Sequence, residues 1–234
     1  MALRPWLCLP TPSKRYAMIM LTAPEPADCG LNCVDSRSAL STEIHQFAES
    51  LGNAIDAKDH FTKLHSEEVA IVSHILALAL GLPPAVVDHI HIAGHLHDIG
   101  KIGIPDKVLQ KKGPLDKAEW EVIKQHPFIG AGIIRPLGFL AASGIADMVL
   151  YHHERYDGGG YPHGLKGEAI PLGARIIALA DGLSAMLQDR PYRPKMTFAQ
   201  ATQEIMNLNG SAYDPFVIHA LLGKLEMIRQ TLGR

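Results

Sequence analysis

The chain has 234 residues, of which 47% are hydrophobic and 20% are charged. This is enough apolar material for one large or two small packed cores, so disorder over the bulk of the chain is excluded. The formal net charge of −2 leaves no basic excess to drive broad binding to nucleic acid or anionic lipid, so we expect neither DNA nor RNA nor a membrane as a partner.

Residues 1–40 are expected to form a poorly ordered N-terminal tail, and residues 41–234 a single domain. The tail mixes proline, serine and scattered charge without helical periodicity. It holds all three cysteines, and an odd number argues against a secreted disulfide scaffold. The sequence contains no run of about 18 uncharged apolar residues, so it predicts no membrane-spanning helix. We therefore expect a cytoplasmic protein.

Hydrophobic periodicity begins near residue 41. Apolar residues recur there at three- and four-residue steps, which is the pattern of an amphipathic helix. Three helices are expected in this first part, over 41–58, 62–80 and 84–99. Gly100 ends the third helix, two residues after Asp98 of the pair His97-Asp98.

A capping signal opens the next helix. Asp116 and Glu119 have the spacing of a capping box, in which each residue's side chain bonds the other's backbone N–H. Pro127 follows His126, and a proline disfavours helical geometry in the residue before it. The helix is therefore expected to end near His126.

The second half also has a helical pattern. Helices are expected over 139–153, 173–188, 197–208 and 215–232, with a glycine-rich break at 158–160. No segment alternates apolar and polar residues with the β-branched enrichment of a strand. The sequence predicts an all-α fold, a single helical bundle.

The pair His97-Asp98 at a helix end is the sharpest local feature. An imidazole and a short carboxylate side by side can bind one metal ion, and the second carboxylate oxygen can bridge to another. Alone, the pair also fits a helix-end histidine beside a solvated aspartate. Position within the rest of the chain must decide between these two interpretations.

Other potential metal ligands recur at helix ends or inside helices. Asp181 lies within a wholly apolar helical run, where a lone ionised carboxylate needs a partner or a cation. Five histidines and two aspartates make a candidate ligand set suited to two divalent ions: His65, His97, Asp98, His126, His152, His153 and Asp181.

Two motifs carry a family resemblance. Residues 97–105 read HDIGKIGIP and residues 152–168 read HHERYDGGGYPHGLKGE. The chain resembles HD-GYP domain proteins, members of the HD superfamily, over essentially all of 41–234. The resemblance implies an all-helical HD-GYP-type domain with a bi- or trinuclear metal centre. It also implies a phosphodiesterase that hydrolyses the cyclic dinucleotide cyclic di-GMP, or cyclic GMP-AMP in some members, to a linear dinucleotide or GMP.

The resemblance also implies roles for these ligands. His65, His97, Asp98 and Asp181 would hold one ion, and Asp98 would bridge to a second ion held by His126, His152 and His153. Trinuclear members carry a glutamate where this chain has Phe61, which cannot bind metal, so we expect two ions. Iron or manganese is expected, while nickel and zinc stay open.

Four further residues are candidates for contact with substrate. The resemblance implies that Lys101 faces the scissile phosphate, where it could stabilise developing charge or protonate the leaving oxygen. Tyr161, exposed by the glycines before it, could stack on a guanine base, and Arg190 and Arg193 could bind phosphate or a guanine edge. Tyr161 could equally be a packing residue, and the arginines could bind helix C-termini.

Two positions depart from the family pattern. Ser184 stands where many members have an aspartate, and Glu68 where relatives have arginine. Ser184 motivates an alternative function: a weakly active or inactive domain that senses nucleotide, or that binds diguanylate cyclase domains through the loop Gly158–Pro162. A homodimer is left open.

The remaining histidines are expected to have core or surface roles. His89, His91 and His95 are expected to point to different faces of their helix, and His45, His60, His74, His163 and His219 are treated in the same way.

Overall fold

The computed structural model describes residues 32–59, 64–189 and 194–234. The chain divides into two compact units, Met1–Thr42 and Glu43–Arg234. The second unit carries all the candidate ligands.

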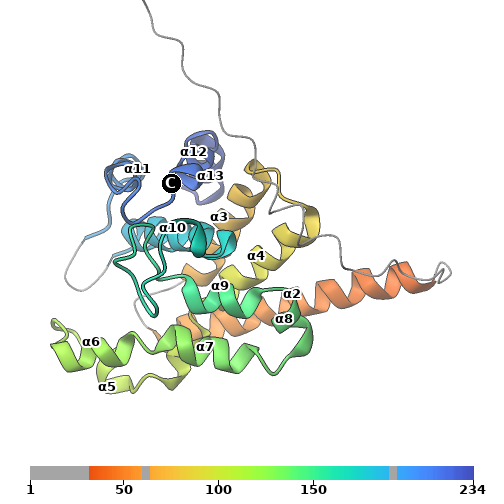
Figure 1. Cartoon of the computed structure of the whole chain (residues 1–234), viewed down its shortest axis with the longest axis horizontal. Helices are drawn as coiled ribbons and strands as arrows, with labels where there is room; N and C mark the ends of the chain where they lie inside the picture. Colours follow the sequence, from red (N-terminus) through yellow and green to blue (C-terminus); the bar gives the residue numbers. More distant parts are fainter. Residues whose placement is uncertain (1–31, 60–63, 190–193) are drawn as a thin grey trace, which may run out of the picture. The chain divides into compact units, whose positions relative to one another are not determined.

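The described residues form helices and connecting turns without a β-strand, apart from one isolated bridge between Asn209 and Tyr213, so the predicted all-α class is confirmed (Figure 1). None of the helices in these ranges is both long and apolar enough to cross a membrane. The α-helices are α2 (Asn32–Lys58), α3 (His65–Ala79), α4 (Pro84–Leu96), α5 (Asp106–Leu109), α6 (Lys117–Ile123), α7 (His126–Ile134), α8 (Gly138–Ala142), α9 (Ile145–Tyr151), α10 (Leu172–Leu187), α11 (Phe198–Asn207), α12 (Pro215–Leu222) and α13 (Leu225–Thr231). Two 3₁₀ turns, η1 (Ile99–Gly103) and η2 (Gly167–Ala169), complete the order.

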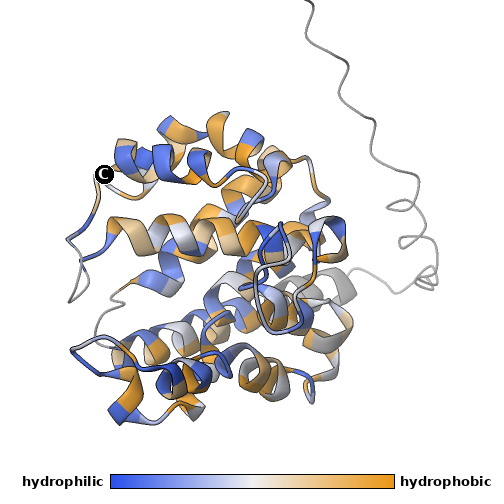
Figure 2. Cartoon of the chain, turned by 60° about the vertical axis from the view of Figure 1, so that its left-hand side comes forward, coloured by the Kyte–Doolittle hydropathy of each residue, from blue (hydrophilic) through white to orange (hydrophobic). Residues whose placement is uncertain are grey.

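Helices α3, α4, α9 and α10 surround the main hydrophobic core. Helix α3 packs against α4 and α10, and α9 packs against α4 and α10. Several of the helices carry both apolar and polar residues (Figure 2). Helices α3 and α4 approach closely at Gly94, where an added Cβ would lie 2.6 Å from Ala70 Cα. The core therefore holds in fixed positions the helices whose ends carry the candidate ligands.

His126 lies at the start of a helix, and the prediction that it ends one is wrong. The capping box of Asp116 and Glu119 is confirmed, but the helix that it opens, α6, ends at Ile123. Helix α7 then begins at His126 with Pro127 in its first turn. Proline suits the first turn of a helix, because a backbone N–H in that turn would have no intrahelical partner and nothing is lost when it is absent. The proline is part of a helix start.

Other predicted helices also differ from the observed ones. Helix α2 begins at Asn32 rather than near residue 41. The predicted helix over 139–153 is divided into α8 and α9, because Gly144 has a positive φ of 79° before α9. The predicted helix over 215–232 is divided into α12 and α13 by Gly223 and Lys224. Such short turns at glycine leave the hydrophobic periodicity of the sequence unbroken, so periodicity alone does not predict them.

A buried ion pair joins α10 to the start of α12, and it carries a prediction for stability. Arg175 contacts the carboxylate of Asp214, and both side chains are buried. Replacing Arg175 by methionine leaves a buried carboxylate without its counter-charge, so we expect Arg175→Met to lower the free energy of unfolding by about 3–5 kcal/mol. Urea titration measures this. The matched control is Arg135→Met, which removes a solvent-exposed pair with Asp147 and should cost less than about 1 kcal/mol. Equal losses in both variants would contradict the prediction.

Candidate metal centre

Six of the seven candidate ligands come together in two groups that share Asp98. Within each group, the ligand atoms all lie within 4.8 Å of one another. All six residues are buried except His153, which is half-buried. The first group is His65, His97 and Asp98, and the second is Asp98, His126, His152 and His153.

The backbone around Asp98 brings the two groups together. Helix α4 ends at Leu96, His97 is its C-cap, and η1 begins at Ile99. Gly100 in η1 lies so close to α7 that an added Cβ would be 1.8 Å from the carbonyl oxygen of His126. This approach, open only to glycine, places His126 Nε2 3.2 Å from Asp98 Oδ1.

Three of the histidine rings are oriented by backbone carbonyls. The Nδ1 atoms of His97, His126 and His152 donate to the carbonyl oxygens of Gly94, Ile123 and Val149 at 2.8, 2.8 and 2.7 Å, respectively. A ring that donates from Nδ1 in its neutral form has a lone pair on Nε2. Such a hydrogen bond on the outer nitrogen is the usual support of a metal-binding histidine.

His126 and His152 face each other in a way that calls for a cation. Their Nε2 atoms are 3.3 Å apart. Burial lowers the pKa of His126 to about 3 and holds the pKa of His152 well below its ordinary value, so both rings are neutral near pH 7. Two lone pairs then point at each other beside the Asp98 carboxylate. A divalent ion would relieve this contact, because His126, His152 and Asp98 could all serve as its ligands.

His97 and Asp98 form the charged part of the site. His97 Nε2 is buried 3.2 Å from Asp98 Oδ2 and makes no hydrogen bond to any described residue. Burial alone would lower the pKa of His97, but the charge of Asp98 outweighs burial and raises this pKa to about 9. Burial would likewise raise the pKa of Asp98, but the charges of Lys101 and His97 hold it well below its ordinary value. These buried imidazole and carboxylate groups are a donor set that fits a metal ion.

Asp181, on α10, reaches the site through His65. Its Oδ1 atom lies 3.1 Å from His65 Nε2, and its side chain is 18% exposed. Burial acts to raise the pKa of Asp181, but the contact with His65 and the charges of His97 and His153 keep it below its ordinary range. Asp181 is the one predicted ligand that belongs to neither group, although it touches a member of the first.

The two departures from the family pattern, Ser184 and Glu68, are in contact. Ser184 Oγ lies 3.0 Å from His65 Nδ1 and donates a hydrogen bond of 2.7 Å to Glu68 Oε2. Since its proton goes to Glu68, the hydroxyl accepts from His65 Nδ1–H, and His65 Nε2 lies toward Asp181 and the site. Arg234 donates to the other Glu68 oxygen at 2.7 Å and balances the charge. A carboxylate therefore supports His65 through an intervening hydroxyl.

We expect Ser184→Ala to weaken metal binding about 10- to 100-fold, because it removes the acceptor that fixes the His65 ring. Metal content at limiting free Mn²⁺ measures the effect. Ser143→Ala, which removes a hydroxyl bonded only to the nearby Leu140 carbonyl, is the control. Identical metal content in both variants would show that Ser184 does not support His65.

Lys101 lies against Asp98 and against a residue that the sequence did not single out. Its Nζ atom is 2.9 Å from Asp98 Oδ2 and 2.7 Å from Asp59 Oδ2. Burial would lower the pKa of Lys101, but the two carboxylates raise it above its ordinary value, so the ammonium is charged. Asp59 follows the end of α2 and is far from Lys101 in sequence, so no local motif could reveal it.

The loop that contains Tyr161 folds back onto the second group. Gly160 permits this, because an added Cβ would lie 2.3 Å from Arg155 N, and Tyr161 N donates to the carbonyl of His153 at 3.2 Å. The Tyr161 ring lies 4.9 Å from the His153 ring, centroid to centroid. Buried Glu154, also missed from sequence, anchors the loop by accepting from the N–H groups of His163 and Leu165. Arg190 and Arg193 lie outside the described residues.

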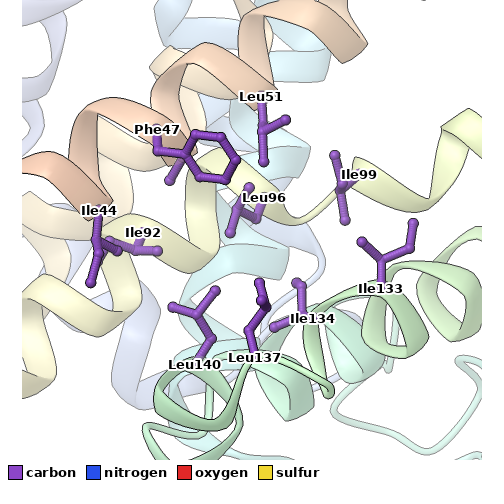
Figure 3. Close-up of a pocket in the computed structure, with 11 residues that line it drawn as sticks. Ile44, Phe47, Leu51, Ile92, Leu96, Ile99, Ile133, Ile134, Leu137 and Leu140 are labelled. Carbon is purple, nitrogen blue, oxygen red and sulfur yellow. The ribbon is translucent and has the colours of Figure 1, made fainter.

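A separate apolar pocket lies between α2, α4, α7 and α8 (Figure 3). Its lining is entirely apolar: Ile44, Phe47, Ala48, Leu51, Ile92, Leu96, Ile99, Ile133, Ile134, Leu137 and Leu140. It offers no group for acid–base chemistry or metal binding. The two groups of ligands that share Asp98, called the Asp98 centre below, are therefore the candidate functional site.

The sequence between residues 49 and 217 matches the family model described as "HD domain". That range covers most of the chain and includes all seven candidate ligands. The chain belongs to the HD domain family. The resemblance to HD-GYP proteins is confirmed within this family.

Two curated relatives and one solved structure agree with this assignment. The chain is 40% identical over 183 residues to a "Cyclic di-GMP phosphodiesterase" of Thermotoga maritima, a match that covers 78% of this chain and 50% of the relative. It is 35% identical over 173 residues to "3'3'-cGAMP-specific phosphodiesterase 2" of Vibrio cholerae, covering 74% of this chain and 33% of the relative. An HDG"Y"P protein from Bdellovibrio bacteriovorus superimposes with a TM-score of 0.60 at 19% identity, covering 82% of this chain and 64% of that one. This HD domain chain thus spans half or less of the length of the two curated relatives.

Proposed function

We propose that this HD domain chain is a metal-dependent phosphodiesterase that hydrolyses a cyclic dinucleotide, with cyclic di-GMP as the first candidate substrate. The products would be the linear dinucleotide, GMP or both. The single observation that carries the proposal is the pair of histidine groups that share the buried carboxylate of Asp98. The names of the curated relatives support the substrate class.

The proposed metal ligands are those of the two groups, together with Asp181. His65, His97, Asp98 and Asp181 would hold one ion, and Asp98, His126, His152 and His153 a second. We propose iron or manganese, with nickel and zinc as further candidates. When bound, two divalent ions supply Lewis acidity that activates water and polarises a phosphoryl oxygen.

The chain's own residues have separate tasks in this proposal. Lys101, held as a cation between Asp98 and Asp59, would stabilise negative charge at the scissile phosphate. The carbonyls behind His97, His126 and His152 fix the rings before substrate arrives, so little reorganisation is needed. Tyr161, which lies over His153, would stack on a guanine base. Arg190 and Arg193 are proposed to bind phosphate or a guanine edge.

The test is turnover by the full chain after anaerobic purification and loading with iron or manganese. Cyclic di-GMP and cyclic GMP-AMP are supplied separately, and chromatography follows the linear dinucleotide and GMP. We expect metal-dependent turnover of cyclic di-GMP that a chelator abolishes. Failure on both substrates by protein with a full metal complement would overturn the proposal.

The alternative is a weakly active or inactive domain that senses a cyclic dinucleotide or binds diguanylate cyclase domains through the loop Gly158–Pro162. Asp157, Gly159 and His163, in and beside this loop, are exposed. Tight nucleotide or cyclase binding without turnover, measured by titration calorimetry, would favour the alternative. We propose the cytoplasm as the site of action in both cases. Sedimentation would decide between a monomer and a homodimer.

A further inference from the structure

Three histidines outside the Asp98 centre come together between α2 and α4. His45 on α2 and His91 and His95 on α4 each offer a ring nitrogen, and these atoms all lie within 4.8 Å of one another. His95 is buried and the other two are half-buried. The prediction that His91 and His95 point to different faces is wrong, since residues four apart on a helix share one face.

The nitrogen atoms of His45 and His91 already lie at the distance expected of two ligands. Their Nε2 atoms are 3.1 Å apart. Two nitrogens that are each about 2.0–2.1 Å from one tetrahedral ion are separated by about 3.4 Å. A small outward shift of either ring would accommodate an ion.

His91 is held in the form that a metal requires. Its Nδ1 atom donates to the carbonyl oxygen of Ala70 on α3 at 3.0 Å, so the Nε2 lone pair faces His45. Burial lowers the pKa of His91 to about 4, which keeps the ring neutral near pH 7. The negative charge of Asp88, one turn earlier on α4, also acts on His91 and would favour a cation there.

We propose that His45, His91 and His95 form a separate metal site, for an imidazole-preferring ion of the zinc class, that joins α2 to α4. Three imidazoles and a water molecule are a ligand set that zinc accepts, and copper, nickel and cobalt share the preference for imidazole. In the metal-free chain, His45 Nε2–H donates to His91. The ion replaces this hydrogen bond, and the His45 proton moves to Nδ1. No ligand of the Asp98 centre takes part.

Zinc content in an Asp98→Asn background tests the proposal without interference from the Asp98 centre. Full-length variants are dialysed against micromolar free zinc and analysed by elemental analysis. Adding His91→Ala is expected to remove one zinc per chain and to weaken zinc binding by about 100-fold or more. His89→Ala is the matched control, because its ring lies on the same helix but contacts Phe139 instead. Equal zinc in the His91→Ala and His89→Ala proteins would overturn the site.

A second variant guards against loss of folding at His91. His45 is half-buried on α2, so His45→Ala should preserve the helical far-UV circular dichroism spectrum. Cobalt is the probe, because tetrahedral Co²⁺ absorbs visible light. We expect the wild-type chain to show one more absorbing equivalent of cobalt than His45→Ala. Superimposable titrations would refute the site, whether or not the chain hydrolyses cyclic dinucleotides.

Discussion

Asp98→Asn is expected to abolish turnover of cyclic di-GMP and to remove metal from the protein. Asp98 is the one residue that both histidine groups share, and its two oxygens face different histidines. Asparagine keeps the shape but removes the charge, and an amide offers a metal only its carbonyl oxygen. Both proposed ions would lose their common ligand, so we expect kcat to fall by on the order of 10³-fold or more. His97→Ala is expected to have a similar effect.

Elemental analysis and product chromatography on the same sample measure both consequences. Asp147→Asn is the control, because Asp147 lies on the surface in a 3.6 Å pair with Arg135 and should retain metal and activity. Thermal unfolding should show Asp98→Asn to be folded. If that variant kept its full metal content and more than a tenth of wild-type kcat, Asp98 could not be the shared ligand.

Lys101→Met is expected to lower kcat about 10²- to 10³-fold while the metal stays bound. Methionine keeps much of the apolar stem of the side chain and removes the ammonium that lies between Asp98 and Asp59. A positive group that faces developing charge in a water-poor site contributes about this much to the rate. The three histidine nitrogens near Asp98 are unchanged, so metal content should not fall.

The control and a companion variant separate charge from packing. Lys58→Met removes an exposed pair with Asp106 and should leave kcat within about twofold of wild type. Asp59→Asn leaves Lys101 in place but loosens it, so we expect a smaller loss of kcat than in Lys101→Met. A Lys101→Met enzyme with wild-type kcat and raised KM would assign this lysine to binding instead of to the reaction.

Sequence patterns predicted much of the local structure. Helix periodicity and capping rules predicted the all-α class and the capping box at Asp116. Of the seven residues that the sequence predicts as ligands, six lie in the two groups that share Asp98. Pro127 predicts a helix end, because proline disfavours helical geometry in the residue before it, but it lies in the first turn of α7, where its missing N–H costs nothing.

Contacts between distant segments were beyond the reach of sequence patterns. Asp59 meets Lys101, and Ser184 meets Glu68, only because α2, α3 and α10 pack as they do. Taken separately, Ser184 is a missing carboxylate and Glu68 a change of charge. In contact, they return a carboxylate to the support of His65. His45 likewise meets His91 only because α2 packs on α4. The four-residue spacing of His91 and His95 is visible in the sequence, so the prediction that they point to different faces could have been avoided.

Helix α2 connects the cluster of His45, His91 and His95 to the pair of Asp59 and Lys101. It carries His45, and its last turn leads into Asp59, whose N–H donates to the carbonyl of Ile55 as in a continued helix. Fourteen residues of helix span about 21 Å, and such a rod resists stretching. Any movement of α2 along its axis would therefore change both the contact between Asp59 and Lys101 and the spacing of His45, His91 and His95. A fluorophore near either end of this helical segment would then report events at the other end.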